Sequence, residues 1–309
     1  MTELLDRIKE NFSRGYFGKV MALEGLPDEY PAWTIKKNDW LGIAVPLENF
    51  TEFSEYFSNM RIFAKDADIG NATYHLLILS CDDISLRNEF ASVCLQFVLP
   101  GNNGEQRNEL IHNPESWWEK WKNLLGNISS SQSPYPVIGE LLVLEYLLKQ
   151  GTDAKWYGAE SGSQDIESPY YFYEVKSTTK RYGYEVTVNS IYQLNNAEHP
   201  VKLVFCRFEP TSSGVSIDML TERLANAGYP EKLLEKSLTR VRFEKGCTAR
   251  KKQYKLLEMK CYEINDDFPV ISESSFKGNV IPKNILRINY TVDLSGVPCE
   301  NLTETEHEQ

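Results

Sequence analysis

Short apolar runs separated by turns make up the first third of the chain. Residues 2–12 place Leu4, Leu5, Ile8 and Phe12 on one helical face, which predicts a short amphipathic helix. The runs predicted to be strands are 17–23, 34–35, 40–45, 75–79 and 93–98. Residues 50–60 fit either a strand or a short helix, and residues 84–94 are predicted to contain a helix. The pattern therefore predicts a β-rich N-terminal domain with a few helices.

A longer helical pattern covers residues 105–126. Trp117, Trp118 and Trp121 recur on it at helical spacing. Packing of these rings between domains is the favoured interpretation, and stacking on nucleic-acid bases is the alternative. The Ser/Pro-rich residues 127–136 that follow predict a linker and a domain boundary.

A strongly apolar helix is predicted for residues 137–149, with Pro136 before its first turn and Gly151 as its C-cap. Two acidic residues, Glu140 and Glu145, lie within this run. Burying an unpaired carboxylate costs of order 2–7 kcal/mol. Glu140 lies among apolar residues, so we expect a metal ion or a lysine as its partner. Glu145 projects elsewhere and is interpreted as structural.

The aromatic run from Tyr170 to Lys176 alternates as a strand does, so Glu174 and Lys176 share one face. Asp165 precedes this run, just after the Gly/Ser-rich residues 161–163. Two carboxylates at one point form an oxygen-rich site that suits Mg²⁺ or Mn²⁺, and a lysine beside them can orient or deprotonate a water. Taken singly, Glu174 and Lys176 also fit an ion pair at a sheet edge, and Asp165 also fits a turn.

The rest of the chain is rich in predicted strands. These strands are 201–208, 214–220, 254–264 and 284–294. The first of them is continuously apolar, as expected at the centre of a sheet. Residues 220–239 supply one or two helices, with a break at 228–230. The tail from Glu300 is acidic, and we expect it to be disordered.

The order of these residues resembles the PD-(D/E)xK nuclease superfamily. Its pattern is an acid on a helix, an Asp at the start of a strand, Glu/Asp-x-Lys on the next strand, and a second helix. Glu140, Asp165 and the run Glu174-Val175-Lys176 match the first three parts. Residues 187–197 match the second helix, where some branches of the superfamily carry a Gln near the site, as Gln193 would be here.

Further residues resemble an uncharacterised bacterial family of PD-(D/E)xK proteins. They are Gly139-Glu140-Leu141 and a Trp-x-Gly formed by Trp156 and Gly158. The chain departs from the superfamily at Gln164, because the residue before the Asp is commonly Pro.

The resemblance implies an α/β fold with a restriction-endonuclease-like core, in which a mixed central sheet is flanked by helices. A β-rich α+β domain precedes this core. We expect residues 1–126 to form the N-terminal recognition or assembly domain with its linking helix. Residues 127–298 would form the nuclease-like domain and residues 299–309 an acidic tail.

The resemblance also implies roles for the site residues. Asp165, Glu174 and the carbonyl oxygen of Val175 would bind Mg²⁺ or Mn²⁺. Lys176 would position and activate the attacking water, and Glu140 would hold a second metal ion or a water. Gln193 is the candidate site-supporting residue.

The net charge of −11 argues against a general nucleic-acid coat protein. It is compatible with a nuclease that confines its positive charge to one groove. The most basic stretch is 236–260, which is either a phosphate-contacting surface or a solvated face. Its candidate DNA-contacting residues are Arg240, Arg242, Arg250, Lys251 and Lys252.

Other chemistries find little support in the sequence. The six cysteines include no C-x-x-C pair, which predicts reduced thiols and no zinc site. The four histidines lack metal-ligand spacing, and neither a Gly-x-Ser-x-Gly elbow nor a P-loop occurs. No run approaches about 20 apolar residues and no secretory signal is seen. A cytoplasmic protein that does not enter the membrane is expected.

The leading hypothesis is a Mg²⁺-dependent DNA endonuclease. By resemblance, its setting would be bacterial restriction or anti-phage defence, beside a methyltransferase or an ATPase, and it would act as a homodimer by analogy. The alternative is a non-catalytic DNA-binding or assembly subunit on a nuclease scaffold. A nuclease that acts on RNA is a third hypothesis.

Overall fold

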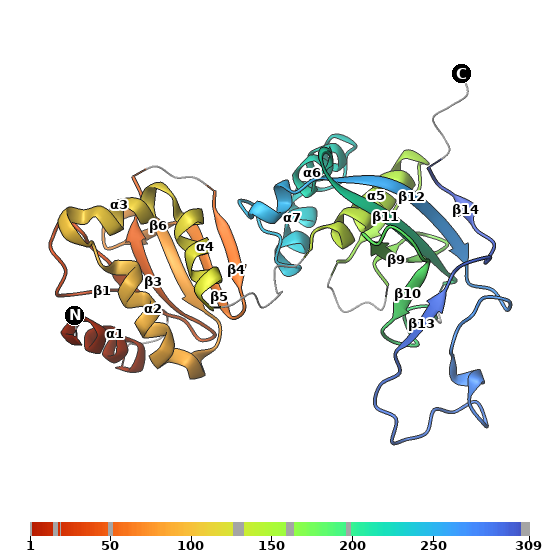
Figure 1. Ribbon diagram of the computed structural model, residues 1–309, viewed down its shortest axis with the longest axis horizontal. Helices are drawn as coiled ribbons and strands as arrows, with labels where there is room; N and C mark the ends of the chain where they lie inside the picture. The colour runs from red at the N-terminus through yellow and green to blue at the C-terminus, as the bar shows by residue number, and fades with distance from the viewer. Residues whose placement is uncertain are drawn as a thin grey trace. The chain divides into compact units, whose positions relative to one another are not determined.

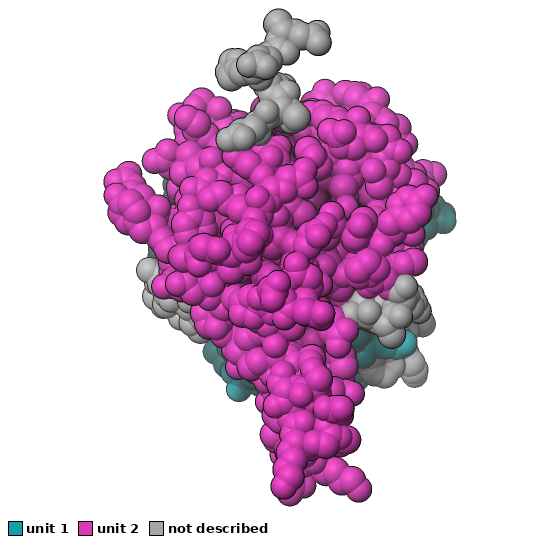
Figure 2. Space-filling view, turned by 90° about the vertical axis from the view of Figure 1, so that its right-hand side faces the viewer, with its two compact units in different colours: residues 1–132, 245–248 teal, residues 133–244, 249–309 magenta. Residues whose placement is uncertain are grey.

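The computed structural model describes residues 2–14, 18, 20–48, 52–125, 133–158, 164–195 and 199–303. The chain divides into two units (Figure 2). Unit 1 comprises residues 1–132 together with 245–248, and unit 2 comprises residues 133–244 and 249–309. The helices and strands of both units are labelled in Figure 1. None of the described helices has both the length and the apolar composition that crossing a bilayer requires.

Unit 1 contains a six-stranded antiparallel sheet with strand order β1-β2-β3-β6-β5-β4. The strands are β1 (Val20–Ala22), β2 (Trp33–Lys36), β3 (Leu41–Pro46), β4 (Ser54–Phe57), β5 (Met60–Ile69) and β6 (Ala72–Cys81). Helices α1 (Thr2–Arg14) and α2 (Arg87–Val98) pack on one face of this sheet, together with Trp118 of α4 (Pro114–Leu125). The main apolar core of the unit lies between the sheet and these helices.

Two predictions for unit 1 were wrong. Residues 93–98 belong to helix α2 and not to a strand, because Phe90, Cys94 and Phe97 recur at helical spacing and face the core. The helix predicted for 105–126 is two helices, α3 (Glu105–His112) and α4, since Pro114 cannot continue α3.

The tryptophans of α4 pack within unit 1. Trp118 is 1% exposed in the core of that unit, and the Trp117 ring meets Phe97 edge-on with 5.3 Å between ring centroids. These two rings therefore pack inside unit 1, whereas the prediction placed their packing between domains.

Residues 245–248 belong to unit 1 although they follow most of unit 2 in sequence. The backbone N–H of Ser54 donates to the carbonyl of Gly246 at 3.3 Å. The carboxylate of Glu55, which is 7% exposed, accepts a hydrogen bond from the backbone N–H of Thr248 at 2.6 Å. This short segment therefore binds the β4 strand at the edge of the sheet.

Unit 2 is built on a mixed sheet with strand order β14-β12-β11-β9-β8-β7. The strands are β7 (Lys155–Trp156), β8 (Ile166–Glu167), β9 (Phe172–Thr178), β11 (Val201–Val215), β12 (Tyr254–Glu263) and β14 (Glu300–Asn301). Strands β9 and β11 are parallel, and the other neighbours are antiparallel. Helix α5 (Tyr135–Lys149) packs against β9 and β11 (Figure 1). Helix α6 (Ile217–Asn226) contacts α5, and α7 (Glu231–Arg240) contacts α6. The mixed α/β architecture expected from the sequence is confirmed.

The opposite face of this sheet is covered by a two-stranded ribbon of β10 (Glu185–Val188) and β13 (Tyr290–Asp293). Val186, Val188 and Val292 of the ribbon pack with Leu203 and Phe205 of β11 in one cluster. The second helix predicted for 187–197 is wrong for the residues that the structure describes. Val186 and Val188 alternate with exposed neighbours, which favours a strand, and turns follow at 191–194.

Several other predictions for unit 2 are settled by the structure. The break between the helices of 220–239 is confirmed between α6 and α7. The strand predicted for 214–220 is wrong from residue 216 onward. Gly214 and Val215 end β11, and Ser216 caps α6 by accepting a hydrogen bond from the N–H of Met219. The strand predicted for 284–294 is reduced to β13, and the expected disordered tail instead begins with β14, while residues 304–309 lie outside the described residues.

Helix α5 approaches β9 closely at Gly139, the residue before Glu140. A Cβ atom at Gly139 would overlap the Oγ of Ser177 and would lie 3.5 Å from Val175 Cγ1. Ser177 Oγ is buried and has no hydrogen-bond partner. The glycine therefore sets the distance between the helix that carries Glu140 and the strand that carries Glu174.

We predict that Gly139→Ala destabilises the protein by about 1–3 kcal/mol, because the added methyl overpacks the interface between α5 and β9. Helix propensity alone would give the opposite sign, by about 1 kcal/mol. Urea denaturation of Gly139→Ala, Ser177→Ala and the double variant measures the coupling. Removal of the Ser177 hydroxyl should recover part of the loss, and purely additive effects would contradict the close contact.

Candidate active site

The pairing between β8 and β9 ends at Asp165, the residue before β8, and the candidate site lies at this end of the pair. Ile166 and Glu167 pair with Tyr173 and Phe172 of β9. One residue earlier, the Asp165 N–H still donates to the Tyr173 carbonyl at 3.0 Å. The next N–H of β9 that faces β8, that of Val175, donates instead to the Asp165 Oδ2 at 2.7 Å. A side-chain carboxylate thus replaces the backbone acceptor where the two strands separate.

Glu174 and Lys176 lie on β9 beside this point. In the parallel pairing of β9 with β11, Glu174 is the register partner of Leu203 and Lys176 that of Phe205. Register partners share a face, so Glu174 and Lys176 face the side of the sheet that the β10–β13 ribbon covers. Lys176 Nζ lies 2.7 Å from Glu174 Oε1. The other carboxylate oxygen, Glu174 Oε2, is buried and has no hydrogen-bond partner. Glu174 and Lys176 therefore form a buried ion pair within β9, an inner strand of the sheet, and one carboxylate oxygen is left without a partner. The alternative of an exposed ion pair at a sheet edge was wrong.

Gln193 contacts the lysine. Lys176 Nζ donates to Gln193 Oε1 at 3.3 Å, and the same oxygen accepts the Asn189 N–H at 2.7 Å. Gln193 lies in a turn after β10, not on a helix as the resemblance implied. Its side chain nevertheless lies beside Lys176, near the candidate site, as the resemblance implied.

Gln164, the residue that replaces the common Pro of the motif, supports the turn that carries Gln193. Its side chain is 6% exposed, and its Nε2 donates to the Tyr192 carbonyl at 2.7 Å and to the Gln193 carbonyl at 3.4 Å. No sequence motif indicated this role for Gln164. An amide beside Asp165 can tie two loops together, which a Pro cannot do because it has no polar side chain.

Glu140 is held on α5 by an indole. Trp156 Nε1 donates to Glu140 Oε2 at 2.6 Å. This contact explains the Trp of the Trp-x-Gly motif, since the strand β7 brings the ring against the helix acid. Glu145, one turn further along α5, forms an ion pair with Arg223 in which Arg223 Nε lies 2.7 Å from Glu145 Oε1. The structural interpretation of Glu145 fits this pair.

Burial raises the pKa of each acidic side chain of the candidate site. Burial, followed by the charge of Asp165, raises the pKa of Glu174 to about 8, and Lys176 only partly opposes this. Burial raises the pKa of Asp165 to about 6, against the lowering effects of the Val175 N–H and Lys176. Burial and then Asp165 also raise the pKa of Glu140. Burial is thus the largest cause of the raised pKa at Glu140, Asp165 and Glu174 alike.

These groups fit a hard divalent cation. A cation between the carboxylates would offset their repulsion, and it would offer a partner to the unused Glu174 oxygen. Among the described residues, no group of three or more His, Cys, Asp or Glu side chains is placed so that it could hold a metal ion. Mg²⁺ commonly binds through only one or two carboxylates, together with waters and substrate phosphates.

The basic residues predicted to contact DNA fall into two groups. Arg250 is 2% exposed, and its guanidinium binds Asp218 at 2.6 Å and Glu235 at 2.8 Å, so its assignment to a DNA-contacting surface is corrected. Its partners lie far away in sequence, so composition could not reveal the pairing. The exposed members of the set are Arg240, Arg242, Lys251 and Lys252. The Gly/Ser-rich residues 161–163 lie outside the described residues.

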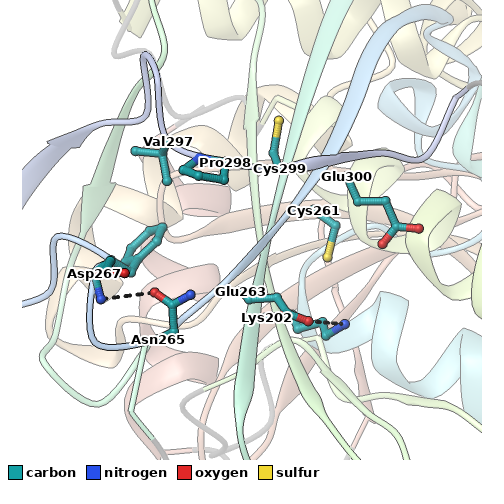
Figure 3. Close-up of a pocket in the computed structure, with 10 residues that line it drawn as sticks. Lys202, Cys261, Glu263, Asn265, Asp267, Val297, Pro298, Cys299 and Glu300 are labelled. Atoms are coloured by element: carbon teal, nitrogen blue, oxygen red, sulfur yellow. Dashed lines mark hydrogen bonds and ion pairs between the residues drawn. The ribbon is translucent and has the colours of Figure 1, made fainter.

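A separate pocket of about 320 Å³ lies over β11, β12 and β14 (Figure 3). Lys202 lines it and lies 3.3 Å from Glu263, and Asp267 and Glu300 add two further carboxylates. Its charge does not suit a phosphate, and none of its lining residues belongs to the candidate active site.

Comparison with known proteins matches this chain to one family model. The model is described as "Putative PD-(D/E)XK family member, (DUF4420)", and it matches residues 57–295, which include every residue of the candidate site. No curated protein and no solved structure matches the chain significantly.

We predict that stability without divalent cations falls between about pH 4.5 and pH 8. Over this window the folded state keeps a proton on Glu174 that the unfolded state has already released, so the free energy of unfolding declines by up to about 1.4 kcal/mol per pH unit. Glu174→Gln removes this titration and should make the decline less steep. Urea denaturation in EDTA across the window measures both proteins.

The matched control for this measurement is Glu48→Gln, which removes an exposed carboxyl. This control should follow the wild-type curve. Parallel curves for wild type and Glu174→Gln would contradict the assigned environment of Glu174.

Proposed function

Because the chain belongs to the DUF4420 family of PD-(D/E)XK proteins, we propose that it is a Mg²⁺-dependent endonuclease that hydrolyses phosphodiester bonds in DNA. The observation that carries the proposal is the meeting of the Asp165 and Glu174 carboxyls with the Lys176 ammonium where β8 separates from β9. These are the groups that metal-assisted hydrolysis requires.

Asp165, Glu174 and the carbonyl oxygen of Val175 are the proposed ligands. Mg²⁺ or Mn²⁺ bound there would lower the pKa of a water and stabilise the charge that develops on the phosphate. The Asp165 carboxylate is fixed by the Val175 N–H, so it is oriented before any ligand arrives. Such preorganisation avoids the cost of ordering the side chain during the reaction.

Lys176 is the proposed water-activating residue. Its ammonium is held between the Glu174 carboxylate and the Gln193 amide oxygen, at 2.7 and 3.3 Å. Two acceptors fix its direction, and Gln164 in turn anchors the Gln193 turn. From this position the ammonium can orient a water and offset phosphate charge.

Glu140 is proposed to hold a second ion or a water. Its Oε2 accepts a hydrogen bond from the Trp156 indole N–H. This bond orients the carboxyl group and partly compensates for its burial. Its pKa is raised by burial and then by Asp165, and a bound cation would act in the opposite direction.

DNA contacts and the biological setting are further parts of this proposal. The exposed Arg240, Arg242, Lys251 and Lys252 are proposed to contact the phosphate backbone. Unit 1 is proposed to serve recognition or assembly. The family resemblance favours bacterial restriction or anti-phage defence, with a homodimer as the acting form and a methyltransferase or an ATPase as partner.

Two observations favour a second candidate function. Among the described residues, no three His, Cys, Asp or Glu side chains could together hold a metal ion, and Lys176 neutralises part of the charge that would attract a cation. A non-catalytic DNA-binding or assembly subunit on the same scaffold is compatible with both facts. The two candidates differ in their response to Mg²⁺.

We predict that Lys176→Ala lowers the rate of DNA cleavage in Mg²⁺ by at least about 100-fold, because a positioned acid–base group contributes on the order of 10²–10⁴. Cleavage of modified and unmodified phage DNA, with RNA as a parallel substrate, is the measurement. Lys180→Ala is the matched control, since Lys180 is exposed in the loop after β9. Wild-type rates for Lys176→Ala would refute the assigned role.

We also predict that Mg²⁺ stabilises the wild-type protein at pH 8. Saturation to 100 times the dissociation constant should add about 2.7 kcal/mol to the free energy of unfolding. Asp165→Asn and Glu174→Gln should lose most of this gain, while Glu48→Gln should keep it. Calorimetric melting with and without Mg²⁺ tests this without reference to activity, and no gain in the wild type would favour the non-catalytic candidate.

A further inference from the structure

The sheet of unit 1 has a second face that no described helix covers. The side chains clustered there come from the strands of the sheet and the turn before β3, and they include Trp33, Trp40, Phe63 and Tyr74. The helices of the unit pack on the other face. We call this second surface the open face. Trp33 and Phe63 are buried there, each 7% exposed, and Trp40 and Tyr74 are partly buried.

An open pocket of about 360 Å³ lies on the open face. Its lining residues include three cations and three aromatic rings, which are Lys37, Arg61, Lys65, Trp40, Tyr56 and Phe63. The acidic residue of the lining is Asp82. The pocket is therefore locally cationic on a chain whose net charge is −11.

The planar groups of the pocket are held in place by their neighbours. Trp40 lies over Gly42, where a Cβ atom would come within 2.5 Å of the indole Cζ3. The Trp40 ring meets Phe63 edge-on, with 6.5 Å between centroids. The presence of glycine on β3 thus lets the indole lie against the sheet and present an aromatic surface.

Arg61 supplies a second planar group. Its Cζ lies 3.9 Å from the centroid of the Phe63 ring and 5.1 Å from that of Tyr56, and its Nε donates to Ser54 Oγ at 3.2 Å. Burial lowers the pKa of Arg61, against the pull of Tyr56 and Asp82. A guanidinium that is stacked and partly desolvated in this way is suited to stacking on a base or meeting a phosphate.

These features select one class of ligand. Aromatic and guanidinium planes stack on the faces of bases, and lysines at the rim contact phosphates. The faces of bases are accessible only when a nucleotide is unpaired. A duplex would offer its phosphates alone and would leave the planar groups unused.

We propose that the pocket of the open face binds an unpaired nucleotide of single-stranded DNA, with the base against Arg61 and Trp40 and the backbone at Lys37 and Lys65. The choice of DNA rests on the proposed nuclease function, whereas the preference for an unpaired base rests on the pocket alone. Such a site would bind a single-stranded end or a displaced strand.

The test uses the full chain and a fluorescent ten-nucleotide oligothymidylate, in EDTA so that no cleavage occurs. Lys37→Gln/Lys65→Gln should raise the dissociation constant at least about 10-fold. It should also reduce the slope of log affinity against log salt by about 1.4, since each phosphate contact to a single strand contributes about 0.7. The control, Lys277→Gln/Lys283→Gln, removes two exposed lysines of unit 2 and should change neither quantity.

Arg61→Lys separates stacking from charge, because it keeps the cation and removes the plane. It should weaken binding of the oligothymidylate about 5-fold or more, and leave binding of an abasic oligomer of equal length unchanged. Thermal melting checks that this variant folds. Equal losses for both oligomers would overturn the stacking role.

The proposal is overturned if the pocket and control double variants bind the oligothymidylate equally, or if a duplex binds as tightly and loses affinity to the same extent. Its failure is distinguishable from failure of the nuclease function. If oligothymidylate binding depends on the pocket but no cleavage occurs in Mg²⁺, only the nuclease function is contradicted. If cleavage occurs in Mg²⁺ but the pocket variants bind normally, only this inference is contradicted.

Discussion

One hydrogen bond, from the N–H of Val175 to the carboxylate of Asp165, determines where the candidate site lies. A strand that leaves a sheet exposes backbone donors that must find another acceptor. Here a side chain is that acceptor, so the sheet opens without an unpaired N–H, and a carboxylate is fixed next to Glu174. The remaining parts of the site, which are Lys176, Gln193 and Glu140, are arranged around this opening.

The site therefore combines rigid positioning with electrostatic strain. Burial raises the pKa values of Glu140, Asp165 and Glu174, and Lys176 only partly opposes this. An arrangement of this kind is costly in the absence of a cation, which is how functional sites differ from ordinary surface ion pairs. The ribbon of β10 and β13 closes the face on which Glu174 and Lys176 lie, so residues near the C-terminus help to build the site.

Local patterns in the sequence predicted much of the site, because its key groups obey short-range rules. Alternation placed Glu174 and Lys176 on one face, and apolar periodicity gave helix α5 with Glu140. Features that depend on distant partners were missed. Arg250 is buried and forms ion pairs with Asp218 and Glu235, and the Gln164 amide donates a hydrogen bond to the Tyr192 carbonyl. The strand β10 was taken for a helix because the superfamily pattern outweighed the alternation of Val186 and Val188.

The return of residues 245–248 to unit 1 limits how this protein can be divided. A fragment that stops in the linker would lack the amide of Thr248, and the enclosed Glu55 carboxylate would lose that donor. The edge strand β4 would also lose its hydrogen bond to Gly246. The two units therefore cannot be exchanged as separate gene segments. A recombination event at the linker would give a unit 1 without residues 245–248.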